Sequence, residues 1–206
     1  KKMKIAFCVS PLTSGHKLRG IGFYTKNLFR SLQNINEIEI QEFTDISEVK
    51  KIDIVHYPFF DLFHPSLPLI KKFPTVVTVH DVTPLVFPKN YPPGIRGSFK
   101  KILQGFSLKG VAAVITDSNS SKVDIEKILK IDPAKIFPVP LAPSELAKPL
   151  KDNKAITKIE QKYNLPEKYA IYIGSVNWNK NLINLSEACI GLNLDLALIG
   201  KDFENQ

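Results

Sequence analysis

Short apolar runs alternate with longer segments of helical spacing along most of the chain. The runs are rich in Val, Ile and Thr, which is typical of strands buried on both faces of a parallel sheet. They cover residues 3–10, 53–57, 75–79, 111–116 and 136–139. Residues 37–43 alternate polar and apolar side chains and predict one further strand.

The segments between these runs repeat apolar side chains at every third or fourth position, as amphipathic helices do. Helices are predicted from Tyr24 to Leu32, over residues 95–109 and after the polar group at 117–121. This alternation predicts an α/β fold, in which a Rossmann-like, mostly parallel sheet is flanked by helices.

The pattern changes after residue 140. Residues 141–168 combine prolines with Ala, Ser and Lys, followed by a short helical segment over 157–163, and we expect a linker and a connecting helix there. Residues 169–206 then show a strand, a helix and a strand. The chain is therefore predicted to hold a Rossmann-like domain over 1–140, and an incomplete βαβ start of a second Rossmann-like unit over 169–206.

A single βαβ unit cannot bury both faces of its own sheet. Three alternatives follow. The unit docks on the first domain, it is completed by a second copy or a partner chain, or the chain is a truncated piece of a longer protein. Unpaired strand edges motivate the second alternative, and the length of the encoding reading frame would test the third.

Net charge narrows the range of partners without naming one. The chain carries 28 Lys and Arg against 20 Asp and Glu, which gives a net charge of +8. Its lysines are scattered, without the interleaved basic and aromatic residues that single-strand binders use. We therefore expect no nucleic-acid partner. A solvated basic surface and a weak association with anionic membranes both remain open.

Cysteine and histidine usage points to a cytoplasmic protein without a metal site. Cys8 and Cys189 lie far apart in apolar contexts, as reduced core residues do. The apolar run at 5–9 is too short for a signal peptide or a membrane span. We expect a cytoplasmic location, extending to the inner face of the membrane. No i, i+4 histidine pair or C-x-x-C motif occurs, so no metal ligands are predicted.

His80 and Asp81 follow the apolar strand 75–79 and precede a proline-rich loop. Ligands of open parallel sheets lie beyond the carboxyl ends of the strands, so we place candidate chemistry here. His80 is suited to act as a general base or to bind a hydroxyl group. Asp81 would orient His80 or bind sugar hydroxyls, and an ordinary turn is the alternative. No nucleophile elbow is present to support a hydrolase.

A glycine-containing segment opens the first long helix. It holds Arg19, Gly20, Gly22 and Tyr24, and glycines at such a position allow a ligand to approach the backbone near a helix N-terminus. The pattern is G-x-G-x-x-T, and Gly20 lies too far beyond the first strand for the dinucleotide fingerprint. We therefore expect no NAD or NADP binding. A loop turn and a substrate contact both remain open.

Two further polar groups open helices. Ser118 and Ser120 either cap a helix or bind phosphate or sugar. Ser175 and Lys180 lie between a strand and the last helix, where a lysine beside a helix N-terminus suits a diphosphate. A plain loop with a solvated lysine is the alternative for this last group.

Taken in order, these groups resemble the motifs of the group 1 family of retaining glycosyltransferases, which have the GT-B fold of two Rossmann-like domains. The resemblance covers nearly the whole chain. Within the family it is closest to bacterial mannosyltransferase-like enzymes of polysaccharide assembly. The matching segments are 19–25, 80–88, 116–122, 135–140, 172–175 and 179–182.

The resemblance implies transfer of a sugar from a nucleotide sugar to a hydroxyl of a glycan or lipid-linked acceptor, with retention and without a metal. It places the acceptor on the first domain, Gly20 and Gly22 near the donor diphosphate, His80 at the transferred sugar, and Lys180 at the leaving diphosphate. That last role fits the charge that develops in the transition state.

Two departures from the family pattern bear on activity. The family commonly has an arginine where this chain has Asn179, just before Lys180. Its second domain also carries two glutamates that hold the donor ribose and sugar, whereas Glu204 is the only acidic residue beyond Asp202 here. We therefore expect these 206 residues alone to be inactive. A non-catalytic half-protein that assembles with itself or with a donor-binding chain is the rival hypothesis.

Overall fold

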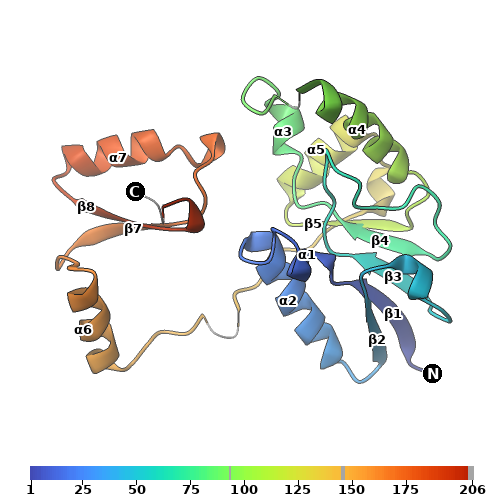
Figure 1. The fold of residues 1–206 in the computed structure, drawn as a ribbon, viewed down its shortest axis with the longest axis horizontal. Helices are drawn as coiled ribbons and strands as arrows, with labels where there is room; N and C mark the ends of the chain where they lie inside the picture. Colours follow the sequence, from blue (N-terminus) through green and yellow to red (C-terminus); the bar gives the residue numbers. More distant parts are fainter. Residues whose placement is uncertain (93, 145–146, 204–206) are drawn as a thin grey trace. The chain divides into compact units, whose positions relative to one another are not determined.

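The computed structural model of the chain describes residues 1–92, 94–144 and 147–203. The chain forms two compact units, Lys1–Ser144 and Glu145–Gln206 (Figure 1). The first holds a six-stranded sheet and the second a two-stranded sheet. Every strand pair is parallel, which confirms the predicted α/β class with a mostly parallel sheet. The division between the units falls inside the segment 141–168 that the sequence predicts as a linker.

The sheet of the first unit has the strand order β2-β1-β3-β4-β5-β6. The chain therefore moves outward from β1 in one direction to β2, and in the other direction from β3 to β6. This reversal between β1 and β3 is the topological switch point of the sheet. The strands are β1 (Met3–Cys8), β2 (Ile38–Phe43), β3 (Ile54–Tyr57), β4 (Thr75–Thr78), β5 (Ala113–Thr116) and β6 (Ile136–Pro138).

Helices connect most of these strands. They are α1 (Ser10–Thr13), α2 (Gly20–Gln33), α3 (Thr83–Val86), α4 (Gly94–Ser107) and α5 (Asn119–Leu129), with the 3₁₀ turns η1 (Ile46–Glu48) and η2 (Pro133–Lys135). The short helices α1 and α3 were not predicted, and α3 lies in the segment predicted as a proline-rich loop. In each, a proline (Pro11 or Pro84) occupies the first helical turn, where its fixed φ angle favours a helix start.

The two faces of the sheet bury different side chains, because successive residues of a strand point to opposite sides. One face is covered by α2, where Phe29 packs on Phe7 and the hydroxyl of Tyr24 meets that of Thr78. The other face is covered by α4 and α5 (Figure 1). The face under α4 and α5 holds the larger apolar cluster. The face under α2 buries the polar side chains of His56 and Thr78 in addition to apolar ones.

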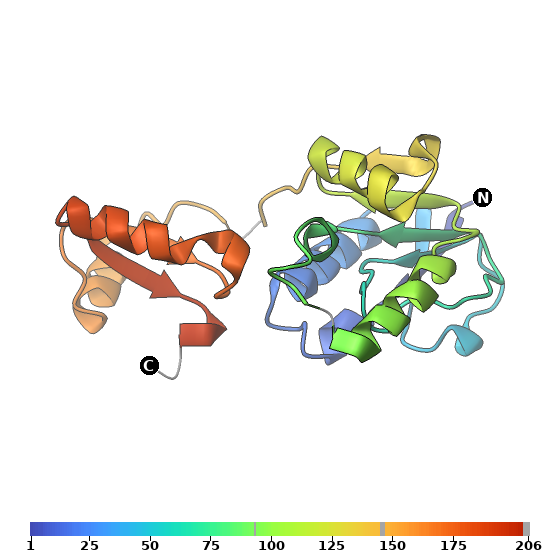
Figure 2. The ribbon, with the colours of Figure 1, turned by 90° about the horizontal axis from the view of Figure 1, so that it is seen from above.

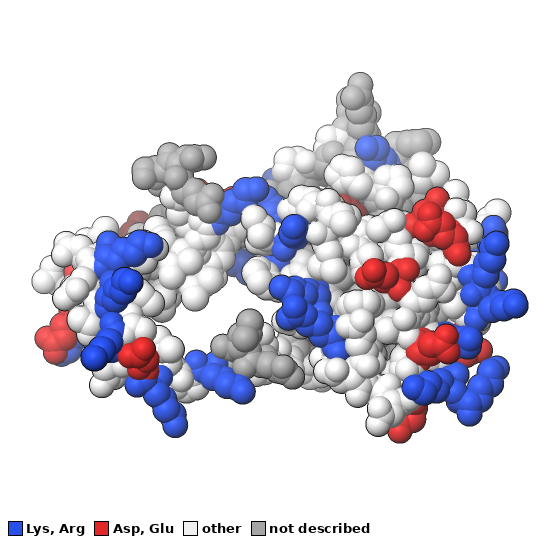
Figure 3. All heavy atoms as spheres, turned by 60° about the horizontal axis from the view of Figure 1, so that its bottom comes forward, with Lys and Arg blue, Asp and Glu red and all other residues white. Residues whose placement is uncertain are grey.

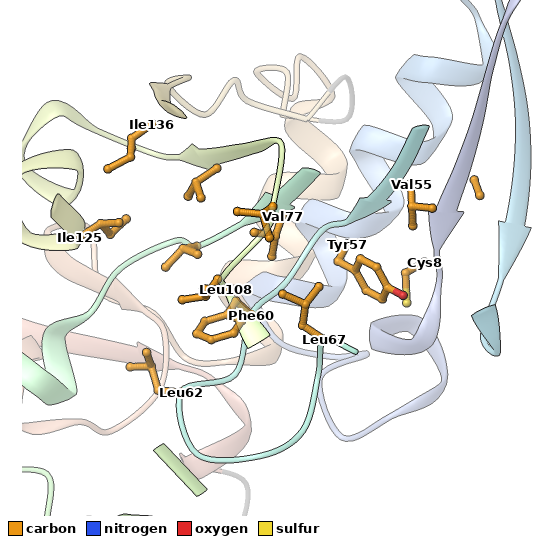
Figure 4. Close-up of a cluster of buried hydrophobic side chains, with 14 of the residues drawn as sticks. Cys8, Val55, Tyr57, Phe60, Leu62, Leu67, Val77, Leu108, Ile125 and Ile136 are labelled. Atoms are coloured by element: carbon orange, nitrogen blue, oxygen red, sulfur yellow. The ribbon is translucent and has the colours of Figure 1, made fainter. Parts of the chain in front are cut away.

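The apolar cluster joins the sheet, α5 and the long segment between β3 and β4. Val55 and Val77 contribute from neighbouring strands, and Ile125 of α5 belongs to the same cluster (Figure 4). Val114 of β5 is a further member. Phe60, Leu62 and Leu67 reach the same cluster from the segment between β3 and β4. This segment is therefore anchored in the core, although it contains no helix or strand.

The second unit contains α6 (Asn153–Lys162), β7 (Tyr169–Ile173), η3 (Trp178–Lys180), α7 (Leu182–Gly191), β8 (Asp195–Ile199) and η4 (Lys201–Phe203). Helix α7 lies along the β7–β8 sheet (Figure 2). Helix α6 begins four residues before the predicted start at 157, because the carboxylate of Asp152 accepts hydrogen bonds from the amides of Lys154 and Ala155 and caps it.

Charged side chains of both signs are interspersed over the visible face in Figure 3. Within the described residues, no helix is both long enough and apolar enough to cross a membrane. Cys8 and Cys189 are buried and free, as the sequence predicts for reduced core residues. The side chains of much of α4 lie outside the described part of the chain, so the predicted apolar pattern at Ile95 and Phe99 is not tested.

Candidate active site

His80 lies two residues beyond the buried end of β4. The backbone of Val79 continues the ladder by donating to the carbonyl of Ile115, and the hydroxyl of Thr116 donates to the carbonyl of His80. Thr78 pairs with Ile115 in the β4–β5 register. Extending that register by two residues places His80 opposite Asp117, with both side chains on the face that α2 covers.

The imidazole of His80 is paired with the carboxylate of Asp117. Its Nδ1 lies 2.9 Å from Oδ2 and 3.1 Å from Oδ1 of Asp117. The two side chains are 18% and 25% exposed. A carboxylate can only accept, so Nδ1 carries the proton and donates. Nε2 of His80 is buried and has no hydrogen-bond partner among the described residues, so its capacity to accept a hydrogen bond is unused.

Tyr24 fixes the imidazole from the side of α2. Its ring meets that of His80 edge-on, with centroids 4.6 Å apart and an interplanar angle of 87°. The Tyr24 hydroxyl lies 3.2 Å from the hydroxyl oxygen of Thr78, which lies 3.0 Å from Nε2 of His56. Burial raises the pKa of Tyr24, and the nearby charge of Asp117 adds to that effect. The phenol therefore stays protonated and serves as a wall of the site.

The structure corrects one alternative for Asp81. The carboxylate that contacts His80 belongs to Asp117, and Asp81 does not orient the imidazole. Asp81 is exposed, and its Oδ1 accepts from the amide of Thr83 at the start of α3. That bond holds its carboxylate in a turn. Binding of sugar hydroxyls by Asp81 stays a prediction.

The two glycines at the start of α2 have different surroundings. A Cβ on Gly22 would lie 2.5 Å from the carbonyl oxygens of His16 and Lys17, so Gly22 lets α2 pack against the preceding loop. Gly20 is the first residue of α2, is exposed and has open space where a Cβ would be. Arg19 caps the helix in an extended conformation and is exposed. Gly20 and Arg19 are thus the members of this segment that a ligand can approach.

The two serines at α5 also differ. Ser118 is the N-cap residue: its hydroxyl oxygen accepts from the amide of Ser121 at 3.0 Å. The capping interpretation of Ser118 therefore holds in the structure. Ser120 is exposed in the first turn of α5.

Ser175 and Lys180 belong to the second unit. The hydroxyl of Ser175 accepts from the side-chain amide of Asn177 at 2.7 Å, and its carbonyl accepts from the hydroxyl of Tyr172 at 2.8 Å. Lys180 is exposed and ends η3, directly before Asn181 and α7. The loop thus holds an exposed lysine before α7, and binding of a diphosphate by Lys180 stays a prediction. Within the described residues, no three His, Cys, Asp or Glu side chains gather in a way that could hold a metal ion.

Comparison with known protein families decides the identity. Residues 16–142 match the family model described as Glycosyltransferase Family 4, and the match covers more than half of the chain. The chain belongs to this glycosyltransferase family. No curated protein matches it. The matched residues include α2, the His80–Asp117 pair and α5, so the described site lies inside the glycosyltransferase domain.

Sequence reasoning missed Asp117 as the partner of His80 in this glycosyltransferase. Asp117 belongs to the polar group 117–121 that precedes a predicted helix, and Asp81 was the predicted partner of His80. The signal was present, since His80 and Asp117 each follow a buried strand, and neighbouring parallel strands end at the same edge. What the sequence lacked was the knowledge that these two strands are neighbours.

Proposed function

We propose that this glycosyltransferase moves a hexose from a nucleotide sugar to a hydroxyl of a glycan or lipid-linked acceptor, with retention of configuration, in polysaccharide or glycolipid assembly. The unpartnered Nε2 of His80, held in place by Asp117 and Tyr24, carries this proposal. A buried acceptor atom at the carboxyl edge of the sheet suits a sugar hydroxyl, which can donate to it. Mannose is the hexose that the resemblance favours.

In this proposal, the exposure of the remaining candidate residues to solvent is what suits them to bind a ligand. Gly20 and Arg19 lie at the N-terminus of a long helix, which favours the negatively charged diphosphate. Lys180, the exposed lysine before α7 in the second unit, suits a diphosphate whose negative charge grows during departure. The proposed reaction needs no metal, so a chelator should leave the rate unchanged, and loss of activity that Mg²⁺ restores would refute metal independence.

The central test is His80→Ala in the protein as its gene encodes it. Transfer from a radiolabelled nucleotide sugar should fall by at least about a hundredfold, because Nε2 no longer holds the transferred sugar. The exposed Glu126 of α5 offers a matched control, and Glu126→Gln should keep the full rate. Circular dichroism should show both variants folded. Full transfer by His80→Ala would refute the proposed site.

The stereochemistry and the competence of the 206 residues are tested separately. Proton NMR of the first product should show the same anomeric configuration as the donor, and an inverted product would refute retention. We expect the 206-residue chain alone to show little or no turnover with nucleotide sugars, because the sheet of its second unit has two strands among the described residues. Robust turnover by this chain would contradict that expectation.

A non-catalytic assembly module is the second candidate, and the exposed apolar side chains of the second unit favour it. Ile171, Ile173 and Ile199 on β7 and β8 are exposed, and neighbouring strands or a second copy would cover them. Sedimentation at increasing concentration tests this. A growing mass together with absence of transfer would support the module, and a monomer at high concentration would reject self-assembly.

Peripheral association with anionic membranes belongs to the same proposal. Leu69 and Ile70 are exposed. They directly precede a basic pair, Lys71 and Lys72, of which Lys72 is the exposed member. The ammonium of Lys71 donates to the carbonyls of Pro68 and Ser107, so Lys72 would face the lipid. Co-sedimentation with anionic vesicles should exceed that with neutral vesicles and fall in Ile70→Glu, and equal sedimentation with both would reject it.

A further inference from the structure

The first unit contains a cavity of about 480 Å³ at the switch point of its sheet. Cys8 at the end of β1 and Tyr57 at the end of β3 line it. The volume lies in the range of small-molecule pockets and far above that of a single water molecule. Switch points are where open parallel sheets bind ligands, because the connections on either side leave in opposite directions. β3, whose end lines the cavity, is the neighbour of β4, the strand that precedes His80.

The segment between β3 and β4 forms one wall of the cavity and is fixed in place. The buried side-chain amide of Gln104, in α4, donates to the carbonyls of Asp61 and His64. The amide of Asp61 donates to the hydroxyl of Ser66 at 2.8 Å. Long connections without helix or strand that are nevertheless ordered are commonly functional. The cavity is therefore formed before any ligand arrives.

Aromatic and hydroxyl-binding groups share the cavity. The rings of His16 and Phe59 are 4.7 Å apart, and Nδ1 of His16 is buried without a hydrogen-bond partner among the described residues. The carboxylate of Asp61, the imidazole of His64 and the hydroxyl of Ser10 also line the space. Such a mixture suits a sugar ring, whose C–H face packs on aromatic side chains while its hydroxyls pair with carboxylate and imidazole groups.

The charged groups that line the cavity bear on whether it suits an uncharged or a phosphorylated sugar. No lysine or arginine is among the described residues that line it. The one carboxylate there, Asp61, already accepts from the amides of Phe63 and His64 through Oδ1, and Oδ2 is contacted by the ring of His64 at 3.3 Å. A phosphate would meet this negative charge without a strong cation to neutralise it.

We propose that the cavity binds an uncharged sugar ring at the end of the acceptor, and discriminates against a phosphorylated one. The inference rests on the proposed function in one respect, because it is the proposed function that identifies the bound sugar as the acceptor. The acceptor class is thereby narrowed to a glycan or glycoside whose reacting end carries no phosphate.

Binding by the 206-residue chain, followed by saturation-transfer NMR and calorimetry, tests the proposal without a donor. The probes are the methyl glycosides of glucose, mannose and galactose, and the matching hexose 6-phosphates. At least one methyl glycoside should bind, and its phosphate should bind at least about tenfold more weakly. Asp61→Asn removes the charge while keeping Oδ1 as an acceptor, and it should narrow that difference.

Two matched variants locate the binding. Ser14→Phe fills the cavity from its rim, whereas Thr13→Phe adds the same ring to the neighbouring exposed residue, which does not line it. The first should weaken glycoside binding at least about tenfold and the second less than about twofold. Absence of glycoside binding, equal or tighter binding of the phosphates, or equal effects of the two variants would overturn the inference. Failure of the proposed function would appear in a different experiment, as full transfer by His80→Ala.

Discussion

At the scale of single residues, the site depends on which atom of His80 carries a proton. Asp117 holds the proton on Nδ1 and leaves Nε2 as the acceptor for a ligand. A histidine without this partner would populate both tautomers, and only one of them presents an acceptor towards the substrate. Asp117 is therefore a positioning residue, which acts on the substrate through His80.

Asp117→Asn should lower transfer about ten- to a hundredfold, because one charge-assisted hydrogen bond is lost and the tautomer is no longer fixed. The ¹⁵N shifts of His80 should show a mixture of tautomers in this variant. Asp81→Asn should leave the tautomer of His80 unchanged, since Asp81 is bonded to the amide of Thr83. A single unchanged Nδ1–H tautomer in Asp117→Asn would contradict the positioning role.

His56 makes the stability of the first unit depend on pH. Its ring is buried against Phe7, and burial lowers its pKa from 6.5 to about 4. Between these values the unfolded chain binds the proton and the folded chain does not. The free energy of unfolding should therefore fall as the pH drops from about 6.5 towards 4, by up to about 3 kcal/mol.

Urea unfolding at a series of pH values, followed by circular dichroism, measures this dependence. His56→Gln keeps a polar atom near Thr78 but does not titrate, so its profile should be flatter over this pH window. The exposed His64 provides the control, and His64→Gln should keep the slope of the parent chain. A slope that survives in His56→Gln would show that another group is responsible.

At the scale of elements, the start of α2 is set by a close approach of two backbone segments. Gly22→Ala should lower the free energy of unfolding by about 1–3 kcal/mol, because its Cβ would press on the carbonyls of His16 and Lys17. Gly20→Ala, two residues earlier, should leave it unchanged or slightly higher, since the position is open and helical. Equal destabilisation by both changes, in thermal melts, would contradict this account of the packing.

The elements also show which kind of sequence pattern is sufficient to predict a helix or a strand. All six strands of the first sheet and the long crossover helices α2, α4 and α5 were predictable, because burial on both faces and helical spacing are local patterns. Helices α1 and α3 were missed because proline marks both loops and helix starts. The early start of α6 followed from the single N-cap residue Asp152, which the apolar pattern does not register.

At the scale of the whole molecule, the first unit is self-sufficient. In the part of the chain that the structure describes, its six strands pair with one another, and the members of the buried cluster lie within residues 1–144. Residues 1–144 expressed alone should therefore keep the thermal transition of the first unit and the pH dependence that His56 confers. An unfolded or aggregated product, by circular dichroism and light scattering, would show that the second unit is needed for its stability.

The sequence by itself determined the α/β class, the positions of the strands and the place of His80 at a strand end. These follow from local patterns, since a strand buried on both faces must be apolar throughout. The pairing of His80 with Asp117 and the cavity between β1 and β3 were decided only by the tertiary structure. Both depend on which strands are neighbours and in what register, and residues 37 positions apart in the chain meet only once that order is set.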